Sequence, residues 1–369
     1  MATTPRELSP QVFGRREDTL LKFSETNDVW DPMFVNHQDT WYLYLLAHKK
    51  DKDQGAFFTQ GTFFTRDNHI HGFCSKNLES WEDLGPIIQP WNNRQRLCAG
   101  NALSVDKTVY FFGSYTFDIV PAKILDQRLY LATSSNGYAF YNEPKFHLEP
   151  DPKWYGTRRT HPVTNEMVFA WRDPFIFQDP KSRRYYLFIC AGAKRWGVPP
   201  TVAVAVAENI TGPYELLPPA VDITVNLDGK KQQALGEIER IQIIYNEEFN
   251  KYYMLFSCWP FYVNQDFVRF CRSIGHAITE STVYVLSSDH VTGTYKFDPV
   301  SPIMRNSEQT GLYGSYMITQ KIEEDGEYIL TGWVPEHFTV WISDEYRVTW
   351  KEGNIHVRTP IQSGISGYR

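Results

Sequence analysis

The sequence predicts an all-β protein, a single-domain five-bladed β-propeller, and three observations lead to this prediction. Short runs rich in Tyr, Phe, Val and Ile fill the chain between residues 34 and 350, with breaks at Asn, Asp, Gly and Pro. No long stretch sustains a helical period. The same arrangement of runs recurs five times, about 70 residues apart, and four strands in each recurrence is the pattern of a propeller blade.

Each recurrence opens with a strand, a turn and a second strand rich in aromatic residues. The five openings are DPMFV…WYLYLL from Asp31, NALSV…VYFFGS from Asn101, DPFIF…YYLFIC from Asp173, ERIQII…YYMLFS from Glu239 and SYMIT…YILTGW from Ser315. A loop then leads to a third strand and to a fourth strand that contains an aromatic residue. These second halves are GFCSKNLESWEDLG, LYLATSSNGYAFY, AVAVAENITGPYEL, VYVLSSDHVTGTYKF and VWISDEYRVTW. We therefore expect five blades of four strands each.

The two ends of the chain fall outside the repeat. Residues 1–20 are expected to form an N-terminal arm, so that the propeller spans residues 21–369. After Trp350 only KEGNIHVRTPIQSGISGYR remains, which is too short for a second domain. This tail is available to supply a strand that closes the ring.

The composition favours a globular protein that binds a small carbohydrate. The chain contains 11 Trp, 22 Tyr and 24 Phe, which excludes a disordered, collagen-like or coiled-coil protein. A net charge of −6 without a basic tract argues against a nucleic-acid partner. No apolar run is long enough to span a membrane. Abundant aromatic rings suit neutral polar ligands such as sugars, while the oligomeric state is left open.

The N-terminal segment and the cysteines predict a cytoplasmic, reducing environment. MATTPRELSPQVFGRRED has charge and proline where a signal peptide needs an apolar core. The five cysteines are odd in number and show neither C-x-x-C spacing nor a zinc pattern. Export by a non-classical route leaves no signal in a sequence, so that route stays open.

Acidic residues stand at three of the five blade openings. They are Asp31 in NDVWDPMFV, Asp173 in WRDPFIF and Glu239 in GEIERIQI. Because the first strand of each blade lines the axis, their carboxyl groups are expected to converge at one end of the channel. Three converging carboxyl groups suit glycoside cleavage, where one attacks the anomeric carbon and another protonates the leaving oxygen. The alternative is that Asp-Pro merely starts a strand after a turn.

A second acidic residue, Glu237, precedes Glu239 by two positions. Strand alternation predicts both carboxyl groups on one face, and Arg240 on the other face or paired with a neighbouring blade. Two close carboxyl groups do not both ionise readily, so one pKa is expected to rise, as a general acid requires. The alternative is an exposed edge strand with mixed charges, although the apolar run that follows indicates an inner strand.

Metal sites and other catalytic motifs have weaker support. His69 and His71 could ligate a metal but suit an ordinary strand better, and Asp51, Asp53 and Asp67 lack the order of a calcium loop. The sequence has no phosphate-binding glycine loop and no nucleophile elbow. We therefore expect no metal and no organic cofactor.

The three acidic motifs resemble those of the five-bladed propeller enzymes that act on β-fructofuranosides, glycoside hydrolase families 32 and 68. NDVWDPMFV is similar to the segment that holds the nucleophile of levansucrase-type enzymes, and WRDPFIF to the Arg-Asp-Pro motif of both families. GEIERI resembles the Glu-Ile-Glu-Arg segment of family 68. The resemblance spans nearly the whole propeller, with the three motifs in the family's order.

The resemblance implies a role for each matching residue. Asp31 would be the nucleophile, Asp173 the transition-state stabiliser and Glu239 the acid/base. A further set would shape the substrate-binding site, namely Trp30, Arg172, Glu237, Arg240, Asn101 and, more weakly, Trp81. The family's further subsite arginine would be Arg269 or Arg272.

The implied activity is that of a retaining β-fructofuranosidase or fructosyltransferase acting on sucrose or a related fructoside. Retaining chemistry predicts that the Asp31 and Glu239 carboxyl groups lie about 5–5.5 Å apart. The chain departs from family 68 where Pro32-Met33-Phe34 replaces Ser-Trp-Pro and Ile241 replaces a proline, which leaves the substrate and the choice between hydrolysis and transfer open. Two alternatives remain, an inverting glycosidase of the arabinanase and xylosidase type on the same fold and a sugar-binding propeller without catalysis.

Overall fold

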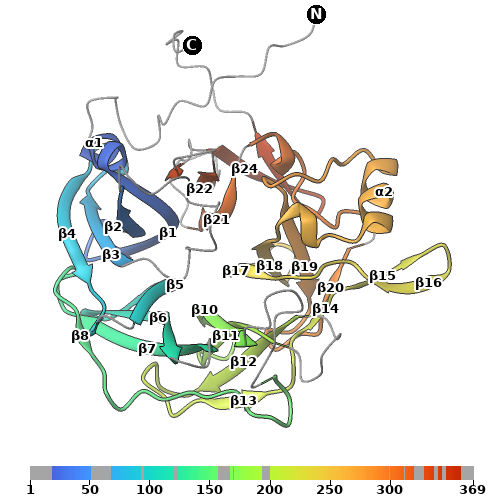
Figure 1. Ribbon diagram of the computed structural model, residues 1–369. Helices are drawn as coiled ribbons and strands as arrows, with labels where there is room; N and C mark the ends of the chain where they lie inside the picture. Colours follow the sequence, from blue (N-terminus) through green and yellow to red (C-terminus); the bar gives the residue numbers. More distant parts are fainter. Residues whose placement is uncertain are drawn as a thin grey trace, which may run out of the picture.

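Five β-sheets are arranged around a central axis, so the predicted five-bladed propeller is confirmed (Figure 1). The computed structural model describes residues 19–50, 68–92, 95–119, 124–156, 167–168, 170–192, 200–298, 300–310, 312–319, 328–335, 340–342 and 346–358. Asp51, Asp53 and Asp67, and nearly all of the predicted N-terminal arm, lie outside these residues. None of the described helices is both long and apolar enough to cross a membrane.

Within each blade, neighbouring strands follow one another outward from the axis in antiparallel pairs. Blade 1 contains β1 (Asn27–His37), β2 (Thr40–Lys49), β3 (His69–Ser75) and β4 (Glu82–Ile88). Blade 2 contains β5 (Gln95–Val105), β6 (Thr108–Ile119), β7 (Ile124–Ser134) and β8 (Tyr141–Asn142), and β9 (Met167–Val168) pairs with β7. Blade 3 contains β10 (Trp171–Gln178), β11 (Tyr185–Ala191), β12 (Thr201–Ala207) and β13 (Glu215–Leu217).

The last two blades contain the C-terminal half of the chain. Blade 4 contains β17 (Glu239–Asn246), β18 (Lys251–Ser257), β19 (Val283–Ser288) and β20 (Tyr295–Phe297), and the short β14 (Val221–Asp222) pairs in parallel with β20. Blade 5 contains β21 (Tyr313–Ile318), β22 (Tyr328–Pro335), β24 (Tyr346–Lys351) and β25 (Asn354–Arg358), and β23 (Val340–Ile342) pairs with β22.

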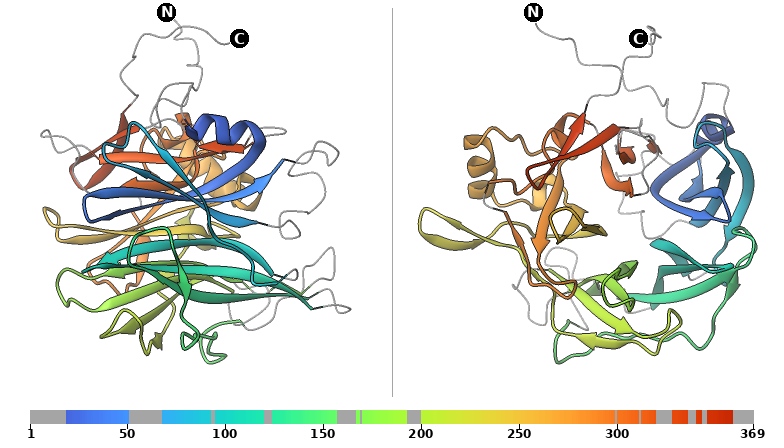
Figure 2. Two further views of the ribbon diagram at one scale, coloured as in Figure 1. Left: turned by 90° about the vertical axis from the view of Figure 1, so that its left-hand side faces the viewer. Right: turned by 180° about the vertical axis from the view of Figure 1, so that it is seen from behind.

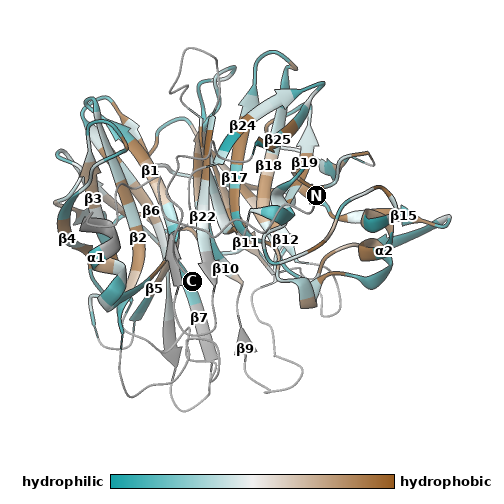
Figure 3. Cartoon of the chain, turned by 90° about the horizontal axis from the view of Figure 1, so that it is seen from above, coloured by the Kyte–Doolittle hydropathy of each residue, from teal (hydrophilic) through white to brown (hydrophobic). Residues whose placement is uncertain are grey.

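The hydrophobic core lies between the blades. Every residue of β11 and of β12 is buried, because both faces of a blade pack against its neighbours, and such strands read as continuous apolar runs. Among the described residues, four clusters of buried side chains result, each shared by adjacent blades. Figure 3 shows the apolar residues concentrated along the blade strands. The inner strands are thereby fixed relative to one another, which positions side chains at the axis.

The C-terminal tail supplies the outermost strand of blade 5, β25, which pairs with β24. The ring closes by packing, since Tyr313 and Trp333 of blade 5 share a core cluster with Val29 and Trp30 of blade 1. The tail therefore contributes a strand as expected, but that strand completes its own blade.

Several further elements lie outside the four-stranded blades. Helix α1 (Thr19–Thr26) packs on blade 1 through Phe23, whose ring contacts His71 and Phe73. The hairpin of β15 (Thr224–Leu227) and β16 (Lys230–Gln233) extends outward beside blade 4 (Figure 2), where α2 (Gln265–Ser273) packs on β15. The described residues also form the 3₁₀ turns η2 (Pro260–Tyr262) and η3 (Ser307–Gln309).

Candidate active site

The innermost strand of every blade has a one-residue β-bulge. The register shifts between Trp30 and Met33 in β1, and at the corresponding place in β5, β10, β17 and β21. In four blades the first residue of the bulge has a positive φ, namely Asp31 (55°), Asp173 (52°), Arg240 (56°) and Gly314 (52°). This conformation is uncommon for residues other than glycine and is maintained only where the surroundings impose it. Bulges re-aim side chains, and here they do so around the axis.

The positions of the bulges show which residues of different blades are structurally equivalent, and these equivalences differ in part from those predicted from the repeat. Asp31 and Asp173 are equivalent as predicted, but the equivalent residue of blade 4 is Arg240, and Glu239 stands one position earlier, in register with Trp30 and Arg172. In blade 2 the bulge falls at Ala99, two residues before the predicted start at Asn101. Because a bulge inserts one unpaired residue, alternation of apolar and polar residues does not reveal where the phase changes.

Arg172 connects three of the four acidic residues at the axis. Its Nη2 lies 2.8 Å from Oε1 of Glu239 and 3.1 Å from Oε1 of Glu237, and its Nε lies 3.7 Å from Oδ2 of Asp173. Glu237 precedes β17 in the chain, and both glutamates reach the same guanidinium group from blade 4. The prediction that Glu237 and Glu239 share a face is therefore confirmed.

Arg240 provides the second guanidinium group of the cluster. Its Nε lies 3.3 Å from Oδ1 of Asp31, and its two terminal nitrogens donate to the carbonyl oxygens of Pro32 and Gly100, both at 3.1 Å. Arg240 therefore pairs with other blades, but across the axis with blades 1 and 2 and not with a neighbour of blade 4 as predicted. These contacts hold the inner strands of blades 1, 2 and 4 together beside the carboxyl groups.

Aromatic side chains of blade 5 complete the cluster. The indole of Trp333 donates to Oδ1 of Asp31 at 3.0 Å, and the hydroxyl of Tyr313 donates to Oε2 of Glu239. The absence of a side chain at Gly314 leaves room for the contact between Trp333 and Asp31, because a Cβ at this position would lie 2.8 Å from Oδ1 of Asp31 and 2.6 Å from Nε1 of Trp333. Tyr313, Gly314 and Trp333 were not among the predicted site residues; Trp333 lies in the fifth recurrence, and Tyr313 and Gly314 directly precede its predicted start at Ser315.

Burial raises the pKa of the acidic residues. It raises the pKa of Asp31 to about 7, because desolvation and the charges of Asp173 and Glu239 outweigh Arg240 and the Trp333 hydrogen bond. The pKa of Asp173 is also raised, again by burial acting against Arg172 and Arg240. Burial, followed by the charge of Glu239, raises the pKa of Glu237 to about 8. The expected rise within the glutamate pair therefore falls on Glu237.

The balance of charge explains why protons are retained at this site. Asp31, Asp173, Glu237 and Glu239 bring four carboxyl groups, and Arg172 and Arg240 bring only two cations. All six side chains are at most one fifth exposed, so water screens them little. The cluster therefore holds ionised and protonated carboxyl groups side by side near neutral pH, the combination that acid/base chemistry uses.

Three other predicted site residues lie in the core. Asn101 is buried, where its Nδ2 donates to the Tyr316 hydroxyl and its Oδ1 accepts from the backbone of Ile176. Trp81 is buried, packs edge-on against Phe34 and donates to the carbonyl oxygen of Leu78. Trp30 is fully buried. These side chains contribute to the packing of the blades.

The weaker candidates lie in other parts of the fold. His71 bonds to Asp83 at 2.7 Å and approaches His69 at 3.4 Å, on the outer strands of blade 1. Arg269 and Arg272 are on α2, where Arg269 pairs with Asp266. Among the described residues, no group of three His, Cys, Asp or Glu side chains could hold a metal ion.

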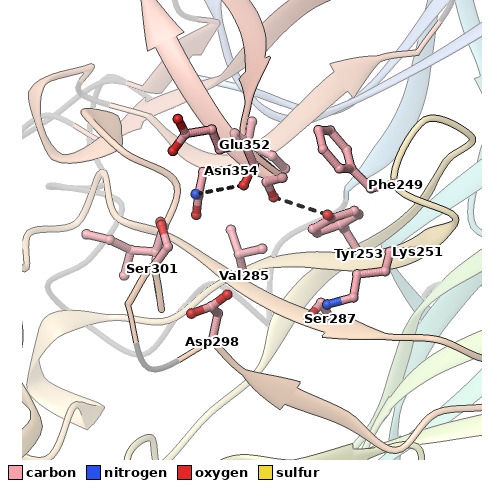
Figure 4. A pocket seen from close by; sticks show the side chains of 12 residues that line it. Phe249, Lys251, Tyr253, Val285, Ser287, Asp298, Ser301, Glu352 and Asn354 are labelled. Carbon is pink, nitrogen blue, oxygen red and sulfur yellow. Dashed lines mark hydrogen bonds between the residues drawn. The ribbon is translucent and has the colours of Figure 1, made fainter.

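A cavity of about 230 Å³ lies between blades 4 and 5 (Figure 4). Its walls include Tyr253, Lys251 and Asn354. Lys251 begins β18, whereas Ser257 ends β18 and accepts a hydrogen bond from Gly314 beside the acidic cluster. Because seven residues of strand span about 20 Å, the cavity and the cluster are at opposite ends of blade 4.

Known structures share this fold. An inulosucrase from Halalkalicoccus jeotgali, bound to kestose, superposes with a TM-score of 0.66 and 19% identity over 100% of this chain and 96% of its own. A levansucrase from Gluconacetobacter diazotrophicus superposes with a TM-score of 0.65 and 14% identity over 97% of this chain and 86% of its own. The GH32 β-fructofuranosidase BmSUC1 of Bombyx mori superposes with a TM-score of 0.59 and 16% identity over 90% of this chain and 63% of its own. No protein-family profile and no curated protein matches the sequence.

Proposed function

We propose that the protein is a retaining β-fructofuranosidase or fructosyltransferase that acts on sucrose or a related fructoside. The observation that carries the proposal is the cluster in which Arg172 pairs with Glu237 and Glu239 beside Asp173, while Arg240 and Trp333 hold Asp31. Paired carboxyl groups with separated protonation states are the machinery of glycosidases, both retaining and inverting. The fold shared with sucrases and levansucrases of other organisms agrees with this activity.

In the first step, the carboxylate of Asp31 attacks the anomeric carbon of the fructosyl group. The bond from that carbon to the departing oxygen breaks, and Glu239 gives this oxygen its proton, so a fructosyl ester of Asp31 forms. Glu237 retains a proton near neutral pH, because burial and the charge of Glu239 raise its pKa to about 8, and it shares the Arg172 guanidinium group with Glu239. The proton needed by the leaving group is therefore held within the pair.

In the second step, a hydroxyl oxygen attacks the same carbon and the ester bond to Asp31 breaks. Glu239 takes the proton of the attacking hydroxyl, which returns both acids to their initial states. Asp173 would bind hydroxyls of the sugar more strongly as the ring flattens, which stabilises the transition state over the ground state. Arg172, Glu237 and Arg240 would position the fructosyl group, with no metal or organic cofactor.

The test is incubation of the purified protein with sucrose, with free glucose and free fructose measured separately and Asp31→Asn as control. Equal release, lost in the variant, indicates hydrolysis, and glucose in excess over fructose indicates transfer. Methanol added as an acceptor should yield the methyl β-fructoside, the retained anomer. Cleavage of arabinosides or xylosides with inversion would support the inverting alternative, and sugar binding without any cleavage would support a binding protein.

A further inference from the structure

Three aromatic rings form a continuous stack that leads from Glu239 to the surface. Tyr313 donates its hydroxyl to Glu239, and its ring stacks on Trp259 at a centroid distance of 4.3 Å and an angle of 24°. Trp259 is in turn nearly parallel to Phe261, at 6.0 Å and 14°. Exposure rises along this series, from 2% at Tyr313 to 71% at Phe261. We call Tyr313, Trp259 and Phe261 the aromatic ramp.

The backbone that carries the ramp is anchored to the segment that carries the glutamates. In the turn η2, the carbonyl oxygen of Tyr262 accepts from the backbone of Gly236 at 2.7 Å, directly before Glu237. The backbone of Asn264 donates to Ala234 at 2.9 Å. A Cβ on Gly236 would lie 3.1 Å from the carbonyl oxygen of Tyr262, so glycine permits this close approach. The ramp is thus held in a defined position relative to the acid/base.

Single exposed aromatic side chains are common on protein surfaces and need no function. Phe261 differs because its ring continues a stack whose innermost member, Tyr313, donates to Glu239, the proposed acid/base. Tyr141 provides the comparison, since it is 73% exposed on β8 at the outer edge of blade 2. A ring that is ordered, exposed and adjacent to a polar cluster is suited to the apolar face of a sugar, whose hydroxyls remain free for polar contacts.

We propose that the aromatic ramp binds the acceptor sugar, and so determines whether the fructosyl group passes to a saccharide or to water. This inference rests on the proposed fructosyl chemistry. A saccharide held on the ramp presents a hydroxyl beside Glu239. Its oxygen bonds to the anomeric carbon, the ester bond to Asp31 breaks, and Glu239 takes the hydroxyl proton. A water molecule can attack the same carbon and give its proton to Glu239 without contacting the aromatic ramp.

The first experiment measures the ratio of transferred to hydrolysed fructosyl groups with sucrose as donor. Phe261→Ala should lower this ratio about threefold to tenfold, the range expected for loss of one aromatic stacking contact. Tyr141→Ala, which removes an equally exposed ring, should leave the ratio unchanged. An unaltered ratio in Phe261→Ala would overturn the proposal.

The second experiment separates this inference from the proposed function. Kestose is titrated by calorimetry into Asp31→Asn, and into the same variant carrying Phe261→Ala or Tyr141→Ala. Weaker binding by about threefold to tenfold in the Phe261 variant alone supports the ramp, even if the wild-type protein releases no glucose from sucrose and the proposed function fails. Absence of kestose binding, or binding insensitive to Phe261, overturns the ramp while glucose release can still confirm the enzyme.

Discussion

Arg172 of blade 3 lies 2.8 Å from Glu239 of blade 4, across the boundary between two independent sheets. The same guanidinium group pairs with Glu237 and approaches Asp173, so one side chain neutralises acids on both sides of this boundary. Arg240 has the corresponding function between blade 4 and blade 1, where it pairs with Asp31. The site is therefore assembled by contacts between blades, and each guanidinium group is held by several partners.

Replacement of Arg172 should affect both stability and activity. Arg172→Ala leaves buried carboxyl groups without their cation, and such a loss costs about 3–5 kcal/mol in the free energy of unfolding. Arg184→Ala is the control, because Arg184 and Glu208 form an exposed pair at 2.7 Å, and it should change the free energy of unfolding by less than about 1 kcal/mol. Denaturant unfolding measures the free energy of unfolding of both variants. Similar losses in the two would contradict the conclusion that Arg172 balances the charge of the buried carboxyl groups.

Asp31→Asn should stabilise the protein at neutral pH while abolishing turnover. The pKa of Asp31 is raised in the folded protein from 3.8 to about 7, so its ionisation opposes folding increasingly as the pH rises through this interval. Asparagine does not ionise, and the variant should be more stable by about 2–4 kcal/mol at pH 8, with the gain shrinking as the pH falls toward 4. Thermal unfolding between pH 5 and 8 tests this, and a pH-independent difference would contradict it.

The dependence of kcat/KM on pH should be bell-shaped, with its maximum between about 7 and 8. Activity is lost below the maximum as Asp31, with a pKa of about 7, takes up a proton. It is lost above the maximum as Glu237, whose pKa is about 8, releases its proton beside Glu239.

Glu237→Gln provides the control for the alkaline side of this profile. The variant removes a neighbouring negative charge and leaves Arg172 beside Glu239. The alkaline limb should therefore move to lower pH. An unmoved limb would show that the proton of Glu237 does not determine it.

Gly314→Ala should disrupt the site through contact with Asp31. The added Cβ would approach Oδ1 of Asp31 to 2.8 Å and Nε1 of Trp333 to 2.6 Å, at a φ of 52°. The variant should lose about 1–3 kcal/mol of stability and most of its activity. Gly229→Ala has a comparable φ of 76° with nothing within 4 Å, so it isolates the cost of the backbone conformation. Equal activity in both variants would contradict a role for the Trp333 hydrogen bond to Asp31.

The sequence was sufficient to predict the blades, because five recurrences of the same strand pattern are visible without any structure. The prediction from strand alternation that Glu237 and Glu239 lie on one side is confirmed in outcome, although Glu237 precedes β17 and the two meet because both pair with Arg172. The sequence repeat placed Glu239, rather than Arg240, in phase with Asp173, because a bulge alters the phase without altering the composition. Tyr313 and Trp333 were missed because their contacts depend on how blade 5 packs against the ring.

The bulge repeated in the five inner strands has a consequence for how such a protein can change. The first residue of the bulge is acidic in two blades, cationic in a third, and alanine or glycine in the other two. The pairing of each inner strand with its neighbour is the same whichever residue occupies the bulge. One pattern of strand pairing can therefore carry a different reactive group in each blade, except where neighbouring side chains leave no room for one, as at Gly314.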